Sequence, residues 1–183
     1  MSRKPPDVAL VVPDVERAHA KAAGLVYVCD TDDGITRGTP LGRLFRVRHE
    51  MSDQWIAFRN AVTKGPATLG LPLGPDRFPY LFRGAKLSIV GVQLFATTID
   101  PLPAFDVTIT PPGADPMPMT IAPRPDLEDQ SILVAQASWP ATPGASVAVA
   151  PNAAGTWGIT AAGGSPLARA RDLLVLVTFT AEQ

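Results

Sequence analysis

Short runs of alternating apolar residues, each stopped by proline or glycine, most constrain how this chain can fold. The clearest run is Phe105-Asp106-Val107-Thr108-Ile109, which ends at Pro111-Pro112-Gly113. Alternate side chains share a face in a strand, whereas one face of a helix needs a period near 3.6 residues. The 20 prolines and 15 glycines further restrict long helices. The pattern therefore predicts a mainly β protein.

Eight segments carry strand-like patterns and are separated by turn residues. This spacing predicts an antiparallel β-sandwich. Within 86–98 the apolar phase slips after Ile89, which predicts a β-bulge between Ile89 and Val90. In 67–73, Pro72 predicts an edge strand, because proline cannot donate to a neighbouring strand. The segments are 67–73, 86–98, 105–109, 119–121, 132–138, 145–150, 156–161 and 172–180.

One or two short helices are expected before the strands. Asp14 can cap a helix that ends before Gly24, and Ser52 can cap a helix over 53–62. Trp55, Phe58 and Val62 form one apolar stripe on the second helix. A short strand is expected over 25–28.

Charge is unevenly distributed along the chain. The net charge of −1 argues against a dedicated nucleic-acid binder, which would need a basic excess. Residues 130–168 contain no charged side chain. Charge normally deters association, so this stretch predicts a surface covered by a neighbouring domain or subunit. The alternative is a compositional drift with harmless polar loops.

Familiar catalytic and metal-binding motifs are missing. The chain has one cysteine and two histidines, His19 and His49, neither with ligands at metal-binding spacing. Cys29 follows an apolar segment and is expected to be a small buried residue. The sequence therefore predicts no enzyme activity, no metal and no cofactor.

Two groups of residues are candidates for binding. Arg43, Arg46, Arg48 and His49 form a basic run near Arg37, which suits a phosphate or an acidic partner. The alternative is a solvated face or a contact with an adjacent domain. Among the three tryptophans, Trp139 lies in the uncharged stretch before a proline and is predicted to be an exposed ligand-binding anchor.

Several ordered motifs resemble a known family. The helix segment Asp53-Gln54-Trp55-Ile56-Ala57-Phe58-Arg59-Asn60 is followed by the alternating Leu69-Gly70-Leu71-Pro72-Leu73 and by Asp76-Arg77-Phe78-Pro79-Tyr80. Gly155-Thr156-Trp157-Gly158-Ile159 and a closing strand come last. This order resembles the C-terminal portion of the A subunits of bacterial Tc (ABC-type insecticidal) toxins. The likeness covers roughly residues 44–183 and leaves 1–43 as a charged leader with a short helix and strand.

The resemblance implies a non-enzymatic β-sandwich module within a toxin-like or secreted assembly. In the toxins this region belongs to a large oligomeric subunit that attaches to the target cell and forms a translocation channel. A chain of 183 residues cannot hold the channel helices or the shell, so a detached module is expected. The family offers no catalytic residue to carry over.

Three functions therefore stay open from the sequence. The first is an interaction module that binds a protein or a cell surface, with the uncharged 130–168 region as its docking surface. The second is a stand-alone carbohydrate-binding domain, and the third is a small structural oligomer. The N-terminus lacks the apolar region of a secretion signal, and no apolar run reaches the length of a membrane span. Synthesis in the cytoplasm is expected, with release as part of a complex as the alternative.

Overall fold

The computed structural model describes residues 40–79, 82, 84–124 and 131–182, without the side chains of 152 and 153. Contacts divide the chain after Gly34, and everything below concerns the unit that starts at Ile35. The expected helix after Asp14, the strand over 25–28, His19, Cys29 and Arg37 lie outside the described residues. The expected division at residue 43 stays a prediction.

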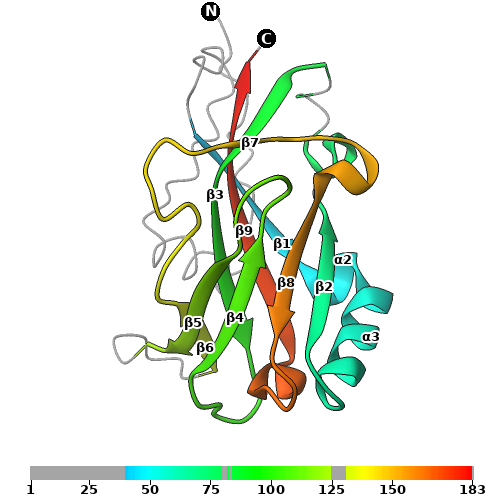
Figure 1. The fold of residues 1–183 in the computed structure, drawn as a ribbon, viewed down its shortest axis with the longest axis vertical. Coiled ribbons are helices and arrows are strands. Elements are labelled where there is room, and N and C mark those ends of the chain that lie inside the picture. Colours follow the sequence, from blue (N-terminus) through cyan, green and yellow to red (C-terminus); the bar gives the residue numbers. More distant parts are fainter. Residues whose placement is uncertain (1–39, 80–81, 83, 125–130, 183) are drawn as a thin grey trace, which may run out of the picture. The chain divides into compact units, whose positions relative to one another are not determined.

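The described part is mainly β and antiparallel, as the alternation predicts. Its strands form one sheet in the order β1-β9-β3-β6-β5-β4-β8-β2, and β7 pairs with β3 (Figure 1). The strands are β1 (Leu41–Arg46), β2 (Ala67–Pro72), β3 (Lys86–Thr97), β4 (Phe105–Thr110), β5 (Met117–Pro123), β6 (Ile132–Ala135), β7 (Val147–Ala148), β8 (Thr156–Ala161) and β9 (Asp172–Glu182). The helices are α2 (Val47–Glu50) and α3 (Ser52–Val62), with 3₁₀ turns η1 (Pro75–Arg77), η3 (Asn152–Gly155) and η4 (Pro166–Arg169).

The sheet is continuous and curled. β6 pairs with β3 on one side and with β5 on the other, so hydrogen bonding passes from one half of the sheet to the other. Trp139 lies beside β3 and Trp157 lies on β8, yet their rings meet edge-on at 4.8 Å. The inward faces of the two halves therefore pack against each other around one core, within a single hydrogen-bonded sheet.

The two helices connect the ends of this sheet. α2 contacts β1 and β9, and α3 contacts β2 (Figure 1). Trp55, Phe58 and Val62 are buried in the same core cluster as the strands. The helix predicted over 53–62 and its apolar stripe are confirmed.

The predicted cap of this helix is wrong. Ser52 is the first helical residue, and Met51 takes the N-cap position without a side-chain hydrogen bond. Met51 is also the C-cap of α2: its N–H donates to the Val47 carbonyl, while its own carbonyl accepts from Trp55 N–H. With a single residue between the two helices, no room is left for a separate serine cap.

The predicted bulge in β3 is confirmed. Ile89 pairs with Phe179 and Gly91 with Thr178, so Val90 is the extra residue. The bulge keeps Leu87 and Ile89 on the same inward face as Val92 and Leu94. β2 is the last strand in the sheet order, which also agrees with the position of Pro72.

The alternation pattern misses β1. Leu41–Arg46 pairs with β9 along its whole length, but only Phe45 is fully buried. Arg43 and Arg46 interrupt the apolar pattern because β1 is the other end strand of the sheet. Its partner β9 is buried on both faces: Leu174 and Leu176 are 3% and 4% exposed, and the inward-facing Val175 and Val177 are 0% exposed.

Candidate functional site

The structure buries Trp139, so the prediction of an exposed anchor is wrong. Its side chain is 6% exposed and packs against Trp157. The backbone of Trp139 exchanges two hydrogen bonds with Val92, at 2.8 and 2.9 Å. Pairing with β3 turns the ring toward the core, although the flanking residues look like an exposed loop in the sequence.

The uncharged stretch 130–168 is divided between core and surface. Every residue of β6 is buried, and Trp139 and Trp157 lie in the core. Residues 141–146 are exposed, and β8 turns alternate side chains outward. The exposed neutral positions of the stretch lie in this loop, on the outer face of β8 and in the short segments 136–138 and 162–164.

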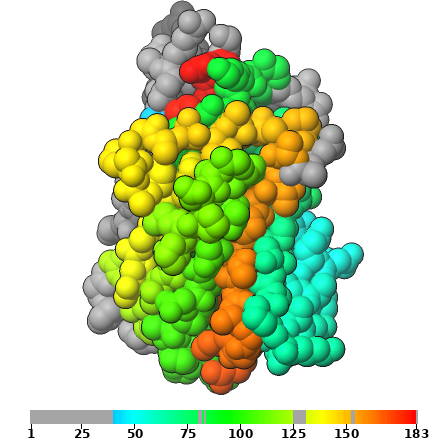
Figure 2. Space-filling model, in the orientation of Figure 1, coloured from blue at the N-terminus to red at the C-terminus, as the bar shows by residue number. Residues whose placement is uncertain are grey.

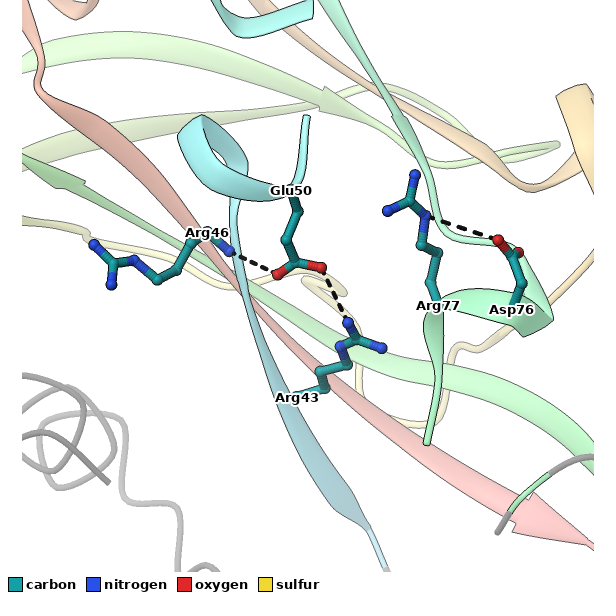
Figure 3. A network of polar contacts seen from close by, with 5 residues as sticks. All are labelled: Arg43, Arg46, Glu50, Asp76 and Arg77. Carbon is teal, nitrogen blue, oxygen red and sulfur yellow. Dashed lines mark hydrogen bonds and ion pairs between the residues drawn. The ribbon is translucent and has the colours of Figure 1, made fainter. Parts of the chain in front are cut away.

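The basic run predicted from the sequence divides into paired and unpaired arginines. Arg43 donates to Glu50 Oε2 at 3.0 Å, and the backbone N–H of Arg46 donates to Glu50 Oε1 at 3.2 Å (Figure 3). The Arg46 guanidinium lies 3.6 Å from Asp172. Both arginines therefore have a carboxylate partner and brace the junction of β1 and α2.

Arg48 is the member of the run that lines a pocket. This partly open pocket has a volume of about 330 Å³. Its walls come from α2, α3, the segment after β3, the end of η4 and the two residues that lead from η4 to β9. The lining residues are Arg48, Ser52, Trp55, Ile56, Arg59, Ile99, Arg169, Ala170 and Arg171.

The pocket is strongly cationic. Four of its nine lining residues are arginines and none is acidic. Among the described residues, the side chains of Arg48, Arg169 and Arg171 form no ion pair or hydrogen bond, and all three are exposed. Unpaired guanidiniums that converge on one cavity suit a phosphate or carboxylate, which they can bind through two parallel hydrogen bonds.

Backbone hydrogen bonds hold Arg48 and Arg171 in place while their guanidiniums stay unpaired among the described residues. Arg48 N–H donates to Asp172 Oδ1 at 2.8 Å, and Arg171 N–H donates to the Thr97 carbonyl at 2.7 Å. Arg59 is fixed through its side chain, since its Nε donates to the Ala168 carbonyl at 2.7 Å. Tethered backbones reduce the ordering that a ligand would otherwise have to impose.

Trp55 lines the pocket and carries an unsatisfied donor. The residue is 1% exposed, and its Nε1 is buried without a hydrogen-bond partner among the described residues. Buried polar groups are nearly always paired, so an orphaned donor beside a cavity calls for a functional explanation.

An apolar rim accompanies the arginines. Among the described residues, Ile56 and Ile99 are the large apolar side chains that are exposed, at 57% and 81%. Both line the pocket. The nearest acidic residues in the chain are Asp53, one turn before Ile56, and Asp100, beside Ile99; both are exposed.

The lining offers little for catalysis. It contains no carboxylate, histidine, cysteine or lysine, and Ser52 is its one hydroxyl group. Within the described ranges, no group of three or more His, Cys, Asp or Glu side chains could hold a metal ion. The described helices are too short or too polar to cross a membrane. The arrangement can bind and orient an anion, and the lining itself supplies no general acid or base.

The sequence points to only one member of this pocket, Arg48. The others come from segments up to 123 positions away, and Arg169 and Arg171 look like ordinary surface charges in a linear reading. No family model, curated protein or solved structure matches the chain. The relation to Tc toxin A subunits stays a prediction.

Proposed function

We propose that the described unit is a non-enzymatic interaction module that recognises an anionic group through the arginine pocket. The observation that carries the proposal is the convergence of Arg48, Arg169 and Arg171, unpaired among the described residues, on one cavity. Two other arginines of the described residues do have carboxylate partners: Arg43 pairs with Glu50, and Arg77 lies 3.9 Å from Asp76 (Figure 3).

A binding role follows from the chemistry of the lining. Charge-assisted hydrogen bonds to a guanidinium are each worth roughly 1.5–3 kcal/mol, and the pocket can offer several at once. The resemblance to Tc toxin subunits supports an interaction role within a larger assembly. The carbohydrate-binding alternative needs an exposed aromatic side chain that a sugar can contact. Trp139, the residue predicted for this role, is buried.

The test is titration calorimetry with hexyl phosphate, and with hexanol as the neutral probe of equal chain length. We expect hexyl phosphate to bind and hexanol not to bind. Arg171→Gln should weaken hexyl phosphate binding by about tenfold, the equivalent of one charge-assisted hydrogen bond. Lys86→Gln is the control, since it removes one positive charge at the opposite end of β3. Equal losses in the two variants would contradict a specific pocket.

A second candidate function is self-association through a neutral sheet face. The outward positions of β2, β8, β4 and β5 hold only one charged residue, Asp106, which accepts a hydrogen bond from Thr120 at 2.7 Å. Figure 2 shows the β4 and β8 part of this face in green and orange. The outward residues are Thr68, Gly70, Pro72, Thr156, Gly158, Thr160, Asp106, Thr108, Thr110, Pro118, Thr120 and Ala122.

Sedimentation equilibrium distinguishes this candidate from the first. If the face joins two copies, the mass should rise with concentration, and Thr108→Lys at its centre should return the protein to monomer. A monomer at all concentrations would remove the second candidate and leave the arginine pocket untouched.

A further inference from the structure

We infer that the anion recognised by the arginine pocket is the headgroup phosphate of an anionic lipid, and that Ile56 and Ile99 enter the membrane interface beside it. The inference rests on the proposed anion-binding function and names its ligand. It depends on the position of the two exposed isoleucines relative to the arginines.

Exposed apolar residues are ordinary when they are scattered over a surface. Here the two exposed isoleucines line the same cavity as four arginines. One comes from α3 and the other from the segment that follows β3, so they lie on different elements. The fold therefore brings the two isoleucines together, and no local sequence pattern indicates it.

A bilayer surface satisfies both kinds of group together. Lipid phosphates lie at the level where arginines bind, and aliphatic side chains can enter the acyl boundary just below. Inorganic phosphate or a nucleic-acid backbone would satisfy the guanidiniums but leave Ile99, at 81% exposure, in water. The lipid phosphate thus explains one more observation than a free phosphate does.

The pocket also occupies a suitable place in the fold. Thr97 at the end of β3 pairs with Asp172 at the start of β9. Arg171 directly precedes Asp172 and Ile99 lies two residues after Thr97, so both lie at one end of the strand pair. At an end of the sheet, the connecting segments can contact a membrane before the strands do.

Two acidic residues near the rim moderate the attraction. Asp53 and Asp100 are both exposed, and Asp172 already lies 3.6 Å from Arg46, so the four arginines of the lining outnumber these carboxylates. The local charge therefore stays positive. Since Asp100 is next to Ile99, it should repel an anionic surface at the point where the isoleucine enters.

The test is co-sedimentation of the full chain with vesicles of equal parts phosphatidylcholine and phosphatidylglycerol, compared with phosphatidylcholine alone. We expect binding to the anionic vesicles and little to the neutral ones. Arg171→Gln should weaken the partition by about fivefold, the usual contribution of one basic residue near an anionic membrane. Asp100→Asn should strengthen it, and Lys86→Gln should leave it unchanged.

Substitution of an isoleucine tests the membrane insertion directly. Ile99→Ser should weaken vesicle binding by about tenfold, given the transfer free energy of an isoleucine side chain. Full vesicle binding by Ile99→Ser would overturn the insertion of that residue.

The outcomes separate the two proposals. Hexyl phosphate binding without vesicle binding would overturn the lipid assignment and keep the anion pocket. Binding of a soluble peptide of alternating glutamate and leucine, without vesicle binding, would replace the lipid with a protein partner. Failure with all three probes would overturn the proposed function itself.

Discussion

Trp55 belongs both to the core and to the pocket wall. Its ring stacks on Phe58 with centroids 6.0 Å apart, and the Arg59 guanidinium lies 5.8 Å from its centre. The adjacent residue Ile56 is of similar apolar character but faces outward. Substitutions at Trp55 therefore test the stability of the fold, whereas substitutions at Ile56 test the apolar rim of the pocket.

We expect Trp55→Ala to lower the free energy of unfolding by about 3–5 kcal/mol, because it empties a fully buried site. Ile56→Ala should change it by less than about 0.5 kcal/mol, as is usual for an exposed position. Urea denaturation followed by circular dichroism measures both. Similar losses in the two variants would contradict the burial described for α3.

Asp172 acts on the pocket through the backbone. It is 3% exposed at the start of β9, and its Oδ1 accepts the Arg48 N–H. Oδ2 is buried without a hydrogen bond among the described residues, 3.6 Å from Arg46 Nε. The carboxylate therefore connects β9 to the short helix that carries Arg48.

Asp172→Ala should cost about 1–3 kcal/mol, because it leaves the Arg48 N–H unsatisfied. Asp172→Asn should cost less, since the amide oxygen can still accept that hydrogen bond. The comparison is made by urea unfolding, with hexyl phosphate affinity measured on each folded variant. If the two substitutions were equally harmful, the charge of Asp172 would matter and the hydrogen bond would not.

At the scale of elements, the β3 bulge decides which side chains reach the core. Val90 has no partner position on β9, whereas Gln93 lies opposite Leu176 within the regular register. Removing Val90 would leave Ile89 and Val92 facing inward. Removing Gln93 would turn Leu94 toward the outer face, because one missing residue reverses every later side chain.

Deletion of Val90 should therefore keep the fold, with a stability loss of about 1–2 kcal/mol from the altered twist, within the range usual for single changes. Deletion of Gln93 should prevent cooperative folding. The thermal unfolding of the two deletion variants, monitored by near-ultraviolet circular dichroism, gives the comparison. A stable Gln93 deletion would show that the register of β3 is less restrictive than the core packing indicates.

The strands could be predicted wherever one face is buried and the other is wet. β4 alternates buried and less buried residues along its length, and so does β8. β1 could not be predicted this way, since Leu44 and the arginines on this end strand blur the alternation. The burial of Trp139 could not be predicted, because Trp139 pairs with Val92 through an isolated bridge outside the regular strands.

The pocket could not be predicted from the chain, for a different physical reason. Its arginines matter because they are unpaired among the described residues, and pairing is a tertiary property. Arg43, Arg46 and Arg48 are neighbours in the sequence, yet only Arg48 lines the cavity. The other two arginines are paired with carboxylates, Arg43 with Glu50 and Arg46 with Asp172. Asp172 is 126 positions beyond Arg46, so this pairing cannot be seen in the sequence.

At the scale of the whole described unit, four separate segments build one cationic site on a nearly neutral chain. The net charge of the protein is −1, so long-range attraction to anions is weak. Binding must therefore depend on local contacts within about a Debye length of the pocket. Raising the salt from about 0.1 M to about 1 M should strongly weaken hexyl phosphate binding, as that length falls from about 10 Å to about 3 Å.

The most direct test of the anion pocket uses the three indole N–H signals in a ¹⁵N-correlated NMR spectrum. Trp55 lines the pocket, whereas Trp139 and Trp157 contact each other elsewhere in the core. During titration with hexyl phosphate, the Trp55 signal should shift and saturate while the other two stay in place. A Trp55 signal that does not move, or equal shifts of all three signals, would contradict the account.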